Sequence, residues 1–216
     1  MGELNLLDLY PKAKRDLNAR QAATPEDRRI AKQFGMEYFD GTRNQGYGGY
    51  RYDGRWKPIV RRFQEHYGLT SNSRVLDVGC AKGFMLHDFY EAIPGISLAG
   101  IDVSQYALDT AMPSVRPFLT IGNAKEIPFE DKSFDLVIAI NSIHNLEIED
   151  LKQSLREINR VSRGNAFVVV DAYRSDEERE AILRWNLTAA TYLHVDEWKA
   201  VFAETGYKGD YYWFIP

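Results

Sequence analysis

A carboxylate and two glycines share one short turn of the chain. In the stretch VLDVGCAKGF, Asp77, Gly79 and Gly83 form an acid-x-Gly-x-x-x-Gly pattern directly after an apolar run. Glycines at a strand-to-helix turn let a nucleotide approach the backbone closely. The dinucleotide fingerprint is not met, because Ala81 and Phe84 occupy its second and third glycine positions, and no P-loop is present. The turn therefore fits neither of these phosphate cradles.

Further polar residues follow the later apolar runs. Asp102 ends the second run, and an acid at this position is the usual reader of ribose hydroxyls in such sheets. Because the carboxyl ends of parallel strands meet at one edge of the sheet, we expect these residues to lie near the glycine turn. The other polar residues at this edge are Asn123, Asn141, His144, Asn145, Asp171 and Tyr173.

Elements that would position these residues alternate along the chain from Ser73 onward. Expected strands cover residues 74–80, 98–103, 118–121, 134–140, 166–170 and 211–215. Expected helices cover residues 57–67, 84–93, a short stretch capped by Ser104, 150–161, 175–187 and 196–206, where the fifth opens with a capping box at Ser175. This alternation predicts an α/β fold, a three-layer Rossmann-like sandwich around a mostly parallel, doubly wound sheet.

The first 56 residues differ from the rest and predict an N-terminal helical and loop appendage. They contain few apolar runs, a helix that starts at Pro25 and a Gly/Tyr-rich stretch over 41–56. We therefore divide the chain into an appendage (1–56) and a Rossmann-like domain (57–216). The Gly/Tyr-rich stretch could be a mobile lid over the site, or a surface loop whose rings pack on the core.

Composition limits the classes of protein to which the chain can belong. The chain has 216 residues, 44% hydrophobic and 27% charged, with a net charge of −4. This acidity argues against a dedicated nucleic-acid binder. One cysteine excludes an internal disulfide, and neither a signal-peptide pattern nor a membrane-length apolar run is apparent. We expect a soluble, cytoplasmic protein without a membrane partner.

Several linked motifs resemble those of the class I (Rossmann-like) S-adenosylmethionine-dependent methyltransferases. VLDVGCAKG resembles the family's glycine loop, and GIDVS (100–104) resembles its second motif. NAKEIPFEDKSFDLVIAINSIHNL (123–146) resembles the adenine-contacting segment with the following strand and turn. DEWKAVFAETGY (196–207) is similar to the last helix of many small-molecule members. The resemblance covers roughly residues 74–206.

The resemblance implies S-adenosylmethionine as the cofactor, S-adenosylhomocysteine as its product, and a set of cofactor-binding residues. These are Asp77, Gly79, Cys80, Ala81, Gly83, Asp102, Val103, Asn123, Ala124 and Asn141. The chain departs from the family pattern at Ala81, which is usually Gly, and at Asn123, which is usually Asp. It also has one clear strand after Gly206 where the family commonly has two. Asp102 could instead be an ordinary strand-end acid, Asn123 a turn residue and Cys80 a small buried apolar side chain.

Candidates for the acceptor site come from both parts of the chain. His144 could act as a general base or only orient the acceptor, and Asn141 is the second catalytic candidate. The expected acceptor-binding residues are Tyr47, Tyr50, Arg51, Arg55, His144, Asp171, Tyr173 and His194. His194 precedes the cap of the final helix, a place that favours a packing role over a position in the pocket. No metal ligands are expected.

These observations predict a methyltransferase that acts on an O or N atom of a small molecule. Basic residues outnumber acids between residues 12 and 62, which favours an anionic acceptor such as a phosphorylated metabolite or a sugar nucleotide. Two alternatives stay open: methylation of a macromolecule, tRNA or protein, and cofactor binding without turnover. A homodimer is compatible with the sequence.

Overall fold

The computed structural model describes residues 2–11, 20 and 22–215 of the chain. Its centre is a seven-stranded sheet in the order β3-β2-β1-β4-β5, with β6 and β7 both paired to β5. Every strand pair is parallel. The strands are β1 (Arg74–Val78), β2 (Ser97–Asp102), β3 (Leu119–Ile121), β4 (Phe134–Ile140), β5 (Ser162–Tyr173), β6 (Leu193–His194) and β7 (Asp210–Phe214). The expected α/β class with a mostly parallel sheet is confirmed.

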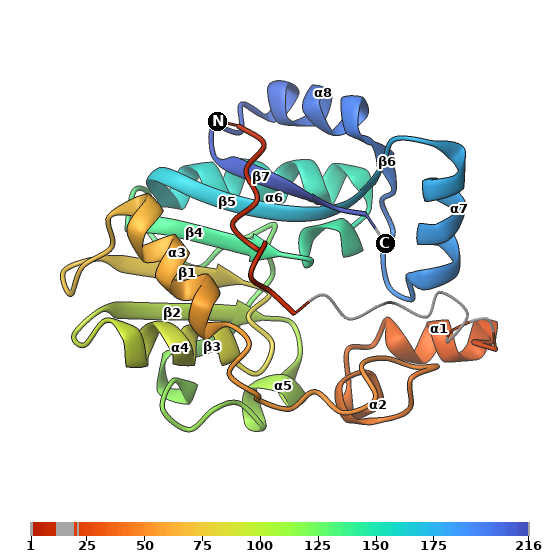
Figure 1. Ribbon diagram of the computed structural model, residues 1–216, viewed down its shortest axis with the longest axis horizontal. Coiled ribbons are helices and arrows are strands. Elements are labelled where there is room, and N and C mark those ends of the chain that lie inside the picture. Colours follow the sequence, from red (N-terminus) through yellow and green to blue (C-terminus); the bar gives the residue numbers. More distant parts are fainter. Residues whose placement is uncertain (1, 12–19, 21, 216) are drawn as a thin grey trace.

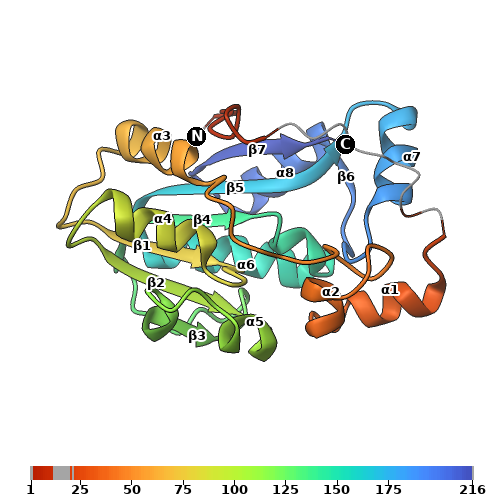
Figure 2. The same ribbon diagram turned by 60° about the horizontal axis from the view of Figure 1, so that its bottom comes forward.

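Helices cover both faces of this sheet (Figures 1 and 2). The helices α3 (Lys57–Tyr67), α4 (Phe84–Ala92) and α5 (Gln105–Asp109) pack on one face, and α6 (Ile148–Val161) and α8 (Val195–Thr205) pack on the other. Successive residues of β5 alternate between these two cores, as the two-residue period of a strand requires: Phe167 and Val169 face α3, whereas Val168 and Val170 face α6 and α8. None of the helices in the described part of the chain is long and apolar enough to cross a membrane.

The final strand runs parallel to its neighbour. β7 pairs with β5 over Phe167–Asp171, and no antiparallel strand follows it among the described residues. The outer edge of β7 is instead met by residues 2–4, where Leu4 N donates to Tyr211 O at 2.8 Å and Tyr211 N donates to Gly2 O at 3.0 Å. The first and last described segments therefore lie side by side.

Several boundaries differ from the sequence-based expectation. β1 ends at Val78 rather than at Cys80, because the N–H groups of Gly79 and Cys80 both turn to the carbonyl of Ile101. β5 begins four residues earlier than residue 166, at Ser162. The short elements α2 (Met36–Asp40) and β6 were not predicted. Helix α7 (Asp176–Trp185) is capped by the Ser175 side chain, but the Glu178 carboxylate accepts from Arg174 N rather than completing a capping box.

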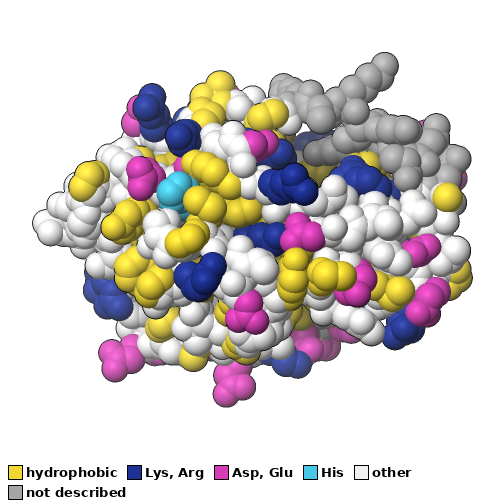
Figure 3. Space-filling view, turned by 90° about the horizontal axis from the view of Figure 1, so that it is seen from below, with side chains coloured by type: hydrophobic (Ala, Val, Ile, Leu, Met, Phe, Trp, Pro, Cys, Tyr) yellow, Lys and Arg dark blue, Asp and Glu magenta, His cyan; other side chains and the backbone are white. Residues whose placement is uncertain are grey.

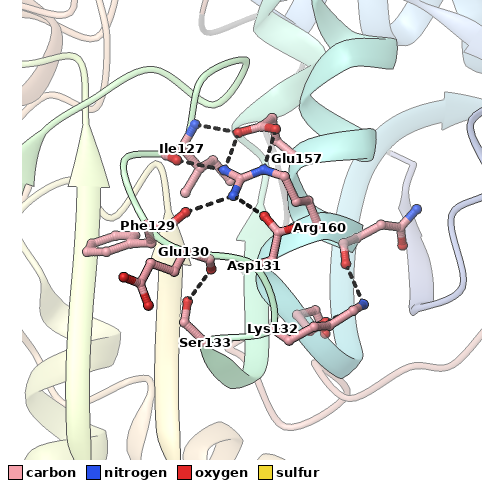
Figure 4. A network of polar contacts seen from close by, with 10 residues as sticks. Ile127, Phe129, Glu130, Asp131, Lys132, Ser133, Glu157 and Arg160 are labelled. Carbon is pink, nitrogen blue, oxygen red and sulfur yellow. Dashed lines mark hydrogen bonds and ion pairs between the residues drawn. The ribbon is translucent and has the colours of Figure 1, made fainter.

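A polar network fixes the loop that follows β3 (Figure 4). The Arg160 guanidinium on α6 donates to the carbonyls of Ile127 and Phe129, each at 2.8 Å, and to the Asp131 carboxylate. Glu157, one turn earlier on α6, accepts from Arg160 and from Ile127 N at 2.9 Å. Because α6 is anchored in the core, this network holds the loop that begins at Asn123 against the end of the sheet.

Residues between the first described segment and α3 form a roof over the carboxyl end of the sheet. This N-terminal roof consists of residue 20 and residues 22–56 and includes α1 (Pro25–Ala31) and α2. The glycine-loop residue Lys82 holds it by an ion pair with Asp40 at 2.5 Å and by a hydrogen bond to Tyr50 O at 3.2 Å. Within the roof, Gly46 lies against the backbone of α2, where an added Cβ would be 1.8 Å from Tyr38 O.

Replacement of Gly46 therefore tests how tightly the roof is packed. We expect Gly46→Ala to lower the free energy of unfolding by about 2–4 kcal/mol, because the clash is with backbone that cannot rotate away. Gly35→Ala is the matched control, since its Cβ would meet only the flexible end of Glu37 at 3.3 Å. Urea denaturation measures both; equal stabilities for the two variants would contradict this packing.

Candidate active site

A cavity of about 940 Å³ lies at the carboxyl ends of β1, β2, β4 and β5, beneath the N-terminal roof. It brings together most of the residues that the sequence singled out. Those that line it are Asp77, Gly79, Cys80, Ala81, Asp102, Val103, Asn123, Ala124, Asn141, His144, Asn145, Asp171, Tyr47, Tyr50 and Arg55. Gly83, Arg51, Tyr173 and His194 are not among the lining residues.

Two buried carboxylates occupy one end of the cavity. Asp77 in β1 and Asp102 at the end of β2 are 7% and 9% exposed. Asp102 is held by the loops on either side, because its oxygens accept from Ala81 N at 2.8 Å and from Ser104 N at 2.9 Å. Each carboxylate oxygen can accept more than one hydrogen bond, so Asp102 retains acceptor capacity toward the cavity.

Burial and mutual repulsion disfavour the ionised form of Asp77. Burial, and secondly the nearby Asp102 carboxylate, raise the pKa of Asp77 to about 7. Burial also raises the pKa of Asp102, and the backbone N–H donors oppose this rise. A cation bound between these groups would favour ionisation of both. This end of the cavity is therefore suited to a positively charged ligand that carries hydroxyl groups.

The glycine loop depends on left-handed backbone conformations. Gly79 has φ +83°, and a Cβ there would lie 2.4 Å from the Cβ of Ser142 in the loop after β4. Ala81 also adopts a positive φ, +48°, which explains why glycine is usual at this position in the family it resembles. Gly83, at φ +70°, precedes α4, and its Cβ would lie 2.9 Å from Val115. Gly83 therefore shapes the loop without lining the cavity.

The loops after β2 and β3 supply a mixed apolar and amide wall. Val103 is 54% exposed although it is apolar, and it lines the cavity together with Ala124. The Asn123 side chain accepts from Lys125 N at 3.1 Å, so its oxygen stabilises the turn. Its amide N–H₂ group is left as a donor for a ligand. The turn role that the sequence left open for Asn123 is therefore present, and the contact with a cofactor stays a prediction.

The loop after β4 brings Asn141 and His144 to the cavity. Asn141 has φ +53°, a conformation that Asn tolerates better than most residues, and its N–H donates to Val169 O at 2.9 Å. The adjacent Ser142 hydroxyl donates to Val78 O at 2.7 Å and ties this loop to β1. Asn141 is itself exposed to the cavity.

His144 belongs to a buried polar network. Its Nδ1 accepts from Asp171 N at 3.2 Å, and its Nε2 lies 3.8 Å from the Asp171 carboxylate. Asp171 in turn accepts from the Asn186 amide, and its carbonyl accepts from the Trp198 indole at 2.9 Å. With Nδ1 occupied, a neutral His144 carries its proton on Nε2. This arrangement favours an orienting role over that of a base.

The remaining acceptor-site candidates lie in different surroundings. The His194 ring accepts from Asp196 N at 3.2 Å as the N-cap of α8, and it packs edge-on against Tyr173 at 5.6 Å. These two side chains stabilise the start of a helix outside the cavity. Arg55 lines the cavity but is paired with Asp53 at 2.5 Å.

Sequence reasoning missed several lining residues, because they belong to no recognisable motif. They are Tyr10, Arg20, Tyr38, Arg43, Trp185, Asn186, Thr188 and Trp213. The excess of basic residues in the first part of the chain was the one signal for Arg20 and Arg43. Residues 12–19, which contributed to that excess, lie outside the described residues. In the described part of the chain, no group of three or more His, Cys, Asp or Glu side chains could hold a metal ion.

The raised pKa of Asp77 predicts a pH-dependent stability. Between the ordinary value of 3.8 and about 7, the unfolded chain has lost this proton while the native state retains it. The free energy of unfolding therefore falls as pH rises through this window, by up to about 4 kcal/mol for a shift of roughly three units.

Asp77→Asn removes this titration, so we expect the variant to gain stability over the wild type from pH 4.5 to pH 8. Urea denaturation at the two pH values measures the gain. Asp109→Asn, at the exposed end of α5, should show no such pH-dependent difference. A constant difference between Asp77→Asn and wild type would contradict the raised pKa.

Comparisons of the chain with known proteins agree with this architecture. Residues 76–170 match the family model described as a methyltransferase domain. An uncharacterised protein of Haemophilus influenzae is 28% identical over 154 residues, which cover 65% of this chain and 61% of that protein. Demethylmenaquinone methyltransferase of Symbiobacterium thermophilum is 29% identical over 55% of this chain and 50% of its own. Malonyl-[acyl-carrier protein] O-methyltransferase of Legionella pneumophila is 30% identical over 57% and 44%. The matched region thus spans about half the length of the two named relatives.

Solved structures share the fold. The YcgJ protein of Bacillus subtilis has a TM-score of 0.56 at 20% identity, over 68% of this chain and 66% of that protein. A Haemonchus contortus phosphoethanolamine N-methyltransferase, solved with phosphomonomethylethanolamine and S-adenosylhomocysteine, has a TM-score of 0.58 at 18% identity, over 82% and 44%. The family model thus identifies a methyltransferase domain over residues 76–170, and the parallel sheet and the solved structures confirm its Rossmann-like fold.

Proposed function

We propose that the protein transfers a methyl group from S-adenosylmethionine to an O or N atom of a small, anionic molecule. The observation that carries this proposal is the pair of buried carboxylates, Asp77 and Asp102, at one end of a cavity whose remaining wall is polar and aromatic. When bound, this cofactor supplies a methyl group activated by a positively charged sulfonium.

The residues at the acidic end fit such a cofactor. Asp102 retains acceptor capacity for ribose hydroxyls, and Asp77 would gain a cationic partner in the cofactor's ammonium group, which would offset its burial. Val103 and Ala124 offer apolar surface for an adenine ring, and the Asn123 amide offers a donor at its edge. The loop of Gly79, Cys80 and Ala81 forms the floor between the two acids.

The other residues would position the acceptor. His144 and Asn141 lie on the loop after β4, and Asp171 at the end of β5 holds the His144 ring. Tyr50 stacks on Phe84 at 4.7 Å and makes a tilted ring contact with Tyr47 at 4.5 Å, so that the N-terminal roof covers the cavity. A closed site aligns the acceptor and excludes water from the reacting atoms.

A small acceptor fits the described surface better than a nucleic acid does. On the face shown in Figure 3, the Lys and Arg side chains of the described residues are interspersed with acidic and hydrophobic ones rather than gathered in one extended basic area. The overall net charge of −4 points the same way. The acceptor site therefore lies inside the cavity.

Cofactor binding can be tested without knowing the acceptor. S-adenosylhomocysteine should raise the melting temperature of the wild type by mass action, whereas NAD should not. Asp102→Ala should weaken S-adenosylhomocysteine binding at least tenfold, because charge-assisted hydrogen bonds to ribose are lost. Asp102→Asn keeps one acceptor oxygen, so its affinity for S-adenosylhomocysteine should lie between those of the wild type and Asp102→Ala. Unchanged affinity in both variants would place the ribose elsewhere.

Methyl transfer is tested with methyl-labelled cofactor and a fractionated cell extract. We expect label in the small-molecule, anionic fraction. Label in RNA or protein would show that the acceptor is a macromolecule rather than a small molecule. Cofactor binding without any labelled product would indicate a binding protein without turnover. In the same assay, His144→Asn keeps an acceptor for Asp171 N, so an unaltered pH profile is expected if His144 only orients the acceptor.

A further inference from the structure

Two guanidinium groups lie over the same aromatic ring. This ring is at the end of the cavity that the N-terminal roof forms. The Arg20 Cζ lies 4.5 Å from the centre of the Trp185 ring, and the Arg43 Cζ lies 5.8 Å from it. Arg20 is only 9% exposed, and it donates to Trp185 O at 2.9 Å and to Gly46 O at 3.0 Å. Arg43 is exposed and donates to Tyr47 O at 2.8 Å. The positive charges are therefore held in place by neutral carbonyl groups.

No carboxylate balances these charges among the described residues. Arg20, Arg43 and the nearby Arg28 form no ion pair there, and every hydrogen bond they make within that part of the chain goes to a backbone carbonyl. Burial, and secondly the charge of Arg43, lower the pKa of Arg20. A buried cation without a counter-ion is costly, and a bound anion would remove this cost.

One buried donor of this group also lacks a partner. The Arg20 Nε is inaccessible and makes no hydrogen bond, although Arg20 lines the cavity. Arg55, which also lines the cavity, is paired with Asp53, and Lys82 in the adjoining glycine loop is paired with Asp40. As far as the described residues extend, the cationic side chains of the cavity wall that lack a carboxylate partner are therefore Arg20 and Arg43, beside Trp185.

A row of tyrosines separates this end from the acid pair. The Tyr38 hydroxyl lies within reach of Tyr47 and Thr188 and close to Arg20. The Tyr50 hydroxyl lies close enough to Asp77 to interact with its charge. The Tyr38 and Tyr47 rings are 5.1 Å apart, and the Tyr47 and Tyr50 rings are 4.5 Å apart. An acceptor that reaches both ends must carry its charge at a distance from the methylated atom.

We propose that Arg20 and Arg43 form the binding site for the anionic group of the acceptor, a carboxylate or a phosphate. A guanidinium offers several N–H donors in a planar fork that matches both groups. The inference rests on the proposed methyl transfer only where it assigns the anion to the acceptor. Anion binding itself is independent of that function.

The site is tested in the absence of cofactor, with inorganic phosphate and acetate as probes and sodium chloride at matched ionic strength as reference. We expect phosphate, acetate or both to raise the melting temperature of the wild type saturably, beyond the effect of chloride. Arg43→Gln should increase the half-saturating concentration at least fivefold. Arg29→Gln is the matched control, since Arg29 is exposed on α1 and already paired with Glu26 at 2.6 Å, and it should respond like the wild type.

The outcomes distinguish a phosphoryl group from a carboxylate as the bound anion. They also distinguish failure of the anion site from failure of the proposed methyl transfer. A larger response to phosphate assigns a phosphoryl group, and a larger response to acetate assigns a carboxylate. A response no larger than that of chloride, or an Arg43→Gln protein that responds like the wild type, overturns the site. Arg20→Lys keeps the charge but loses Nε, and it should also weaken binding; its melting-temperature shift with S-adenosylhomocysteine shows that it has folded. If S-adenosylhomocysteine fails to bind even the wild type, the proposed function fails while the anion measurement still stands.

Discussion

The repulsion between two buried carboxylates organises the site. Asp77 and Asp102 belong to neighbouring parallel strands, so the sheet itself places both acids at one end of the cavity. Their burial costs free energy unless donors or cations compensate it. Asp102 is compensated by the backbone N–H groups of Ala81 and Ser104. Asp77 receives no comparable support, which makes it the position where a cationic ligand gains most.

The cavity is consequently polarised along its length. The two acids lie where β1 and β2 end, whereas the guanidiniums of Arg20 and Arg43, which have no carboxylate partner among the described residues, lie beside Trp185 at the end of α7. Lys82 is paired with Asp40 and so holds the roof to the glycine loop, whereas Arg55 is paired with Asp53 within the roof. Neither side chain therefore carries an unbalanced charge. A cationic cofactor and an anionic acceptor would each meet the end of opposite charge, and this separation orders them in one cavity.

The sequence predicted the domain well where local patterns carry the information. Continuous apolar runs identified β1, β2 and β4, and the acid-x-Gly-x-x-x-Gly turn located the acidic end of the cavity. For His194 the sequence left both a packing role and an acceptor role open, and the contact with Asp196 N shows that the ring caps α8. Arg20 and Asn186 could not be identified, since their roles arise from contacts between segments far apart in the chain. The path of residues 22–56 could not be predicted either, because its backbone hydrogen bonds mostly lie outside regular helices and strands.

The positions of these contacts along the chain bear on the order in which the protein is completed during synthesis. Arg20 and Gly46 leave the ribosome early, but the Trp185 carbonyl and ring that hold Arg20 are made 165 residues later. The pairing of Gly2 and Leu4 with Tyr211 needs almost the entire chain. The sheet from β1 to β5 can assemble in sequence, whereas Arg20 of the roof must wait for α7 and residues 2–4 must wait for β7. Nascent chains released early would therefore present an open cavity with its aromatic wall unsupported, a state that chaperones recognise through its exposed apolar surface.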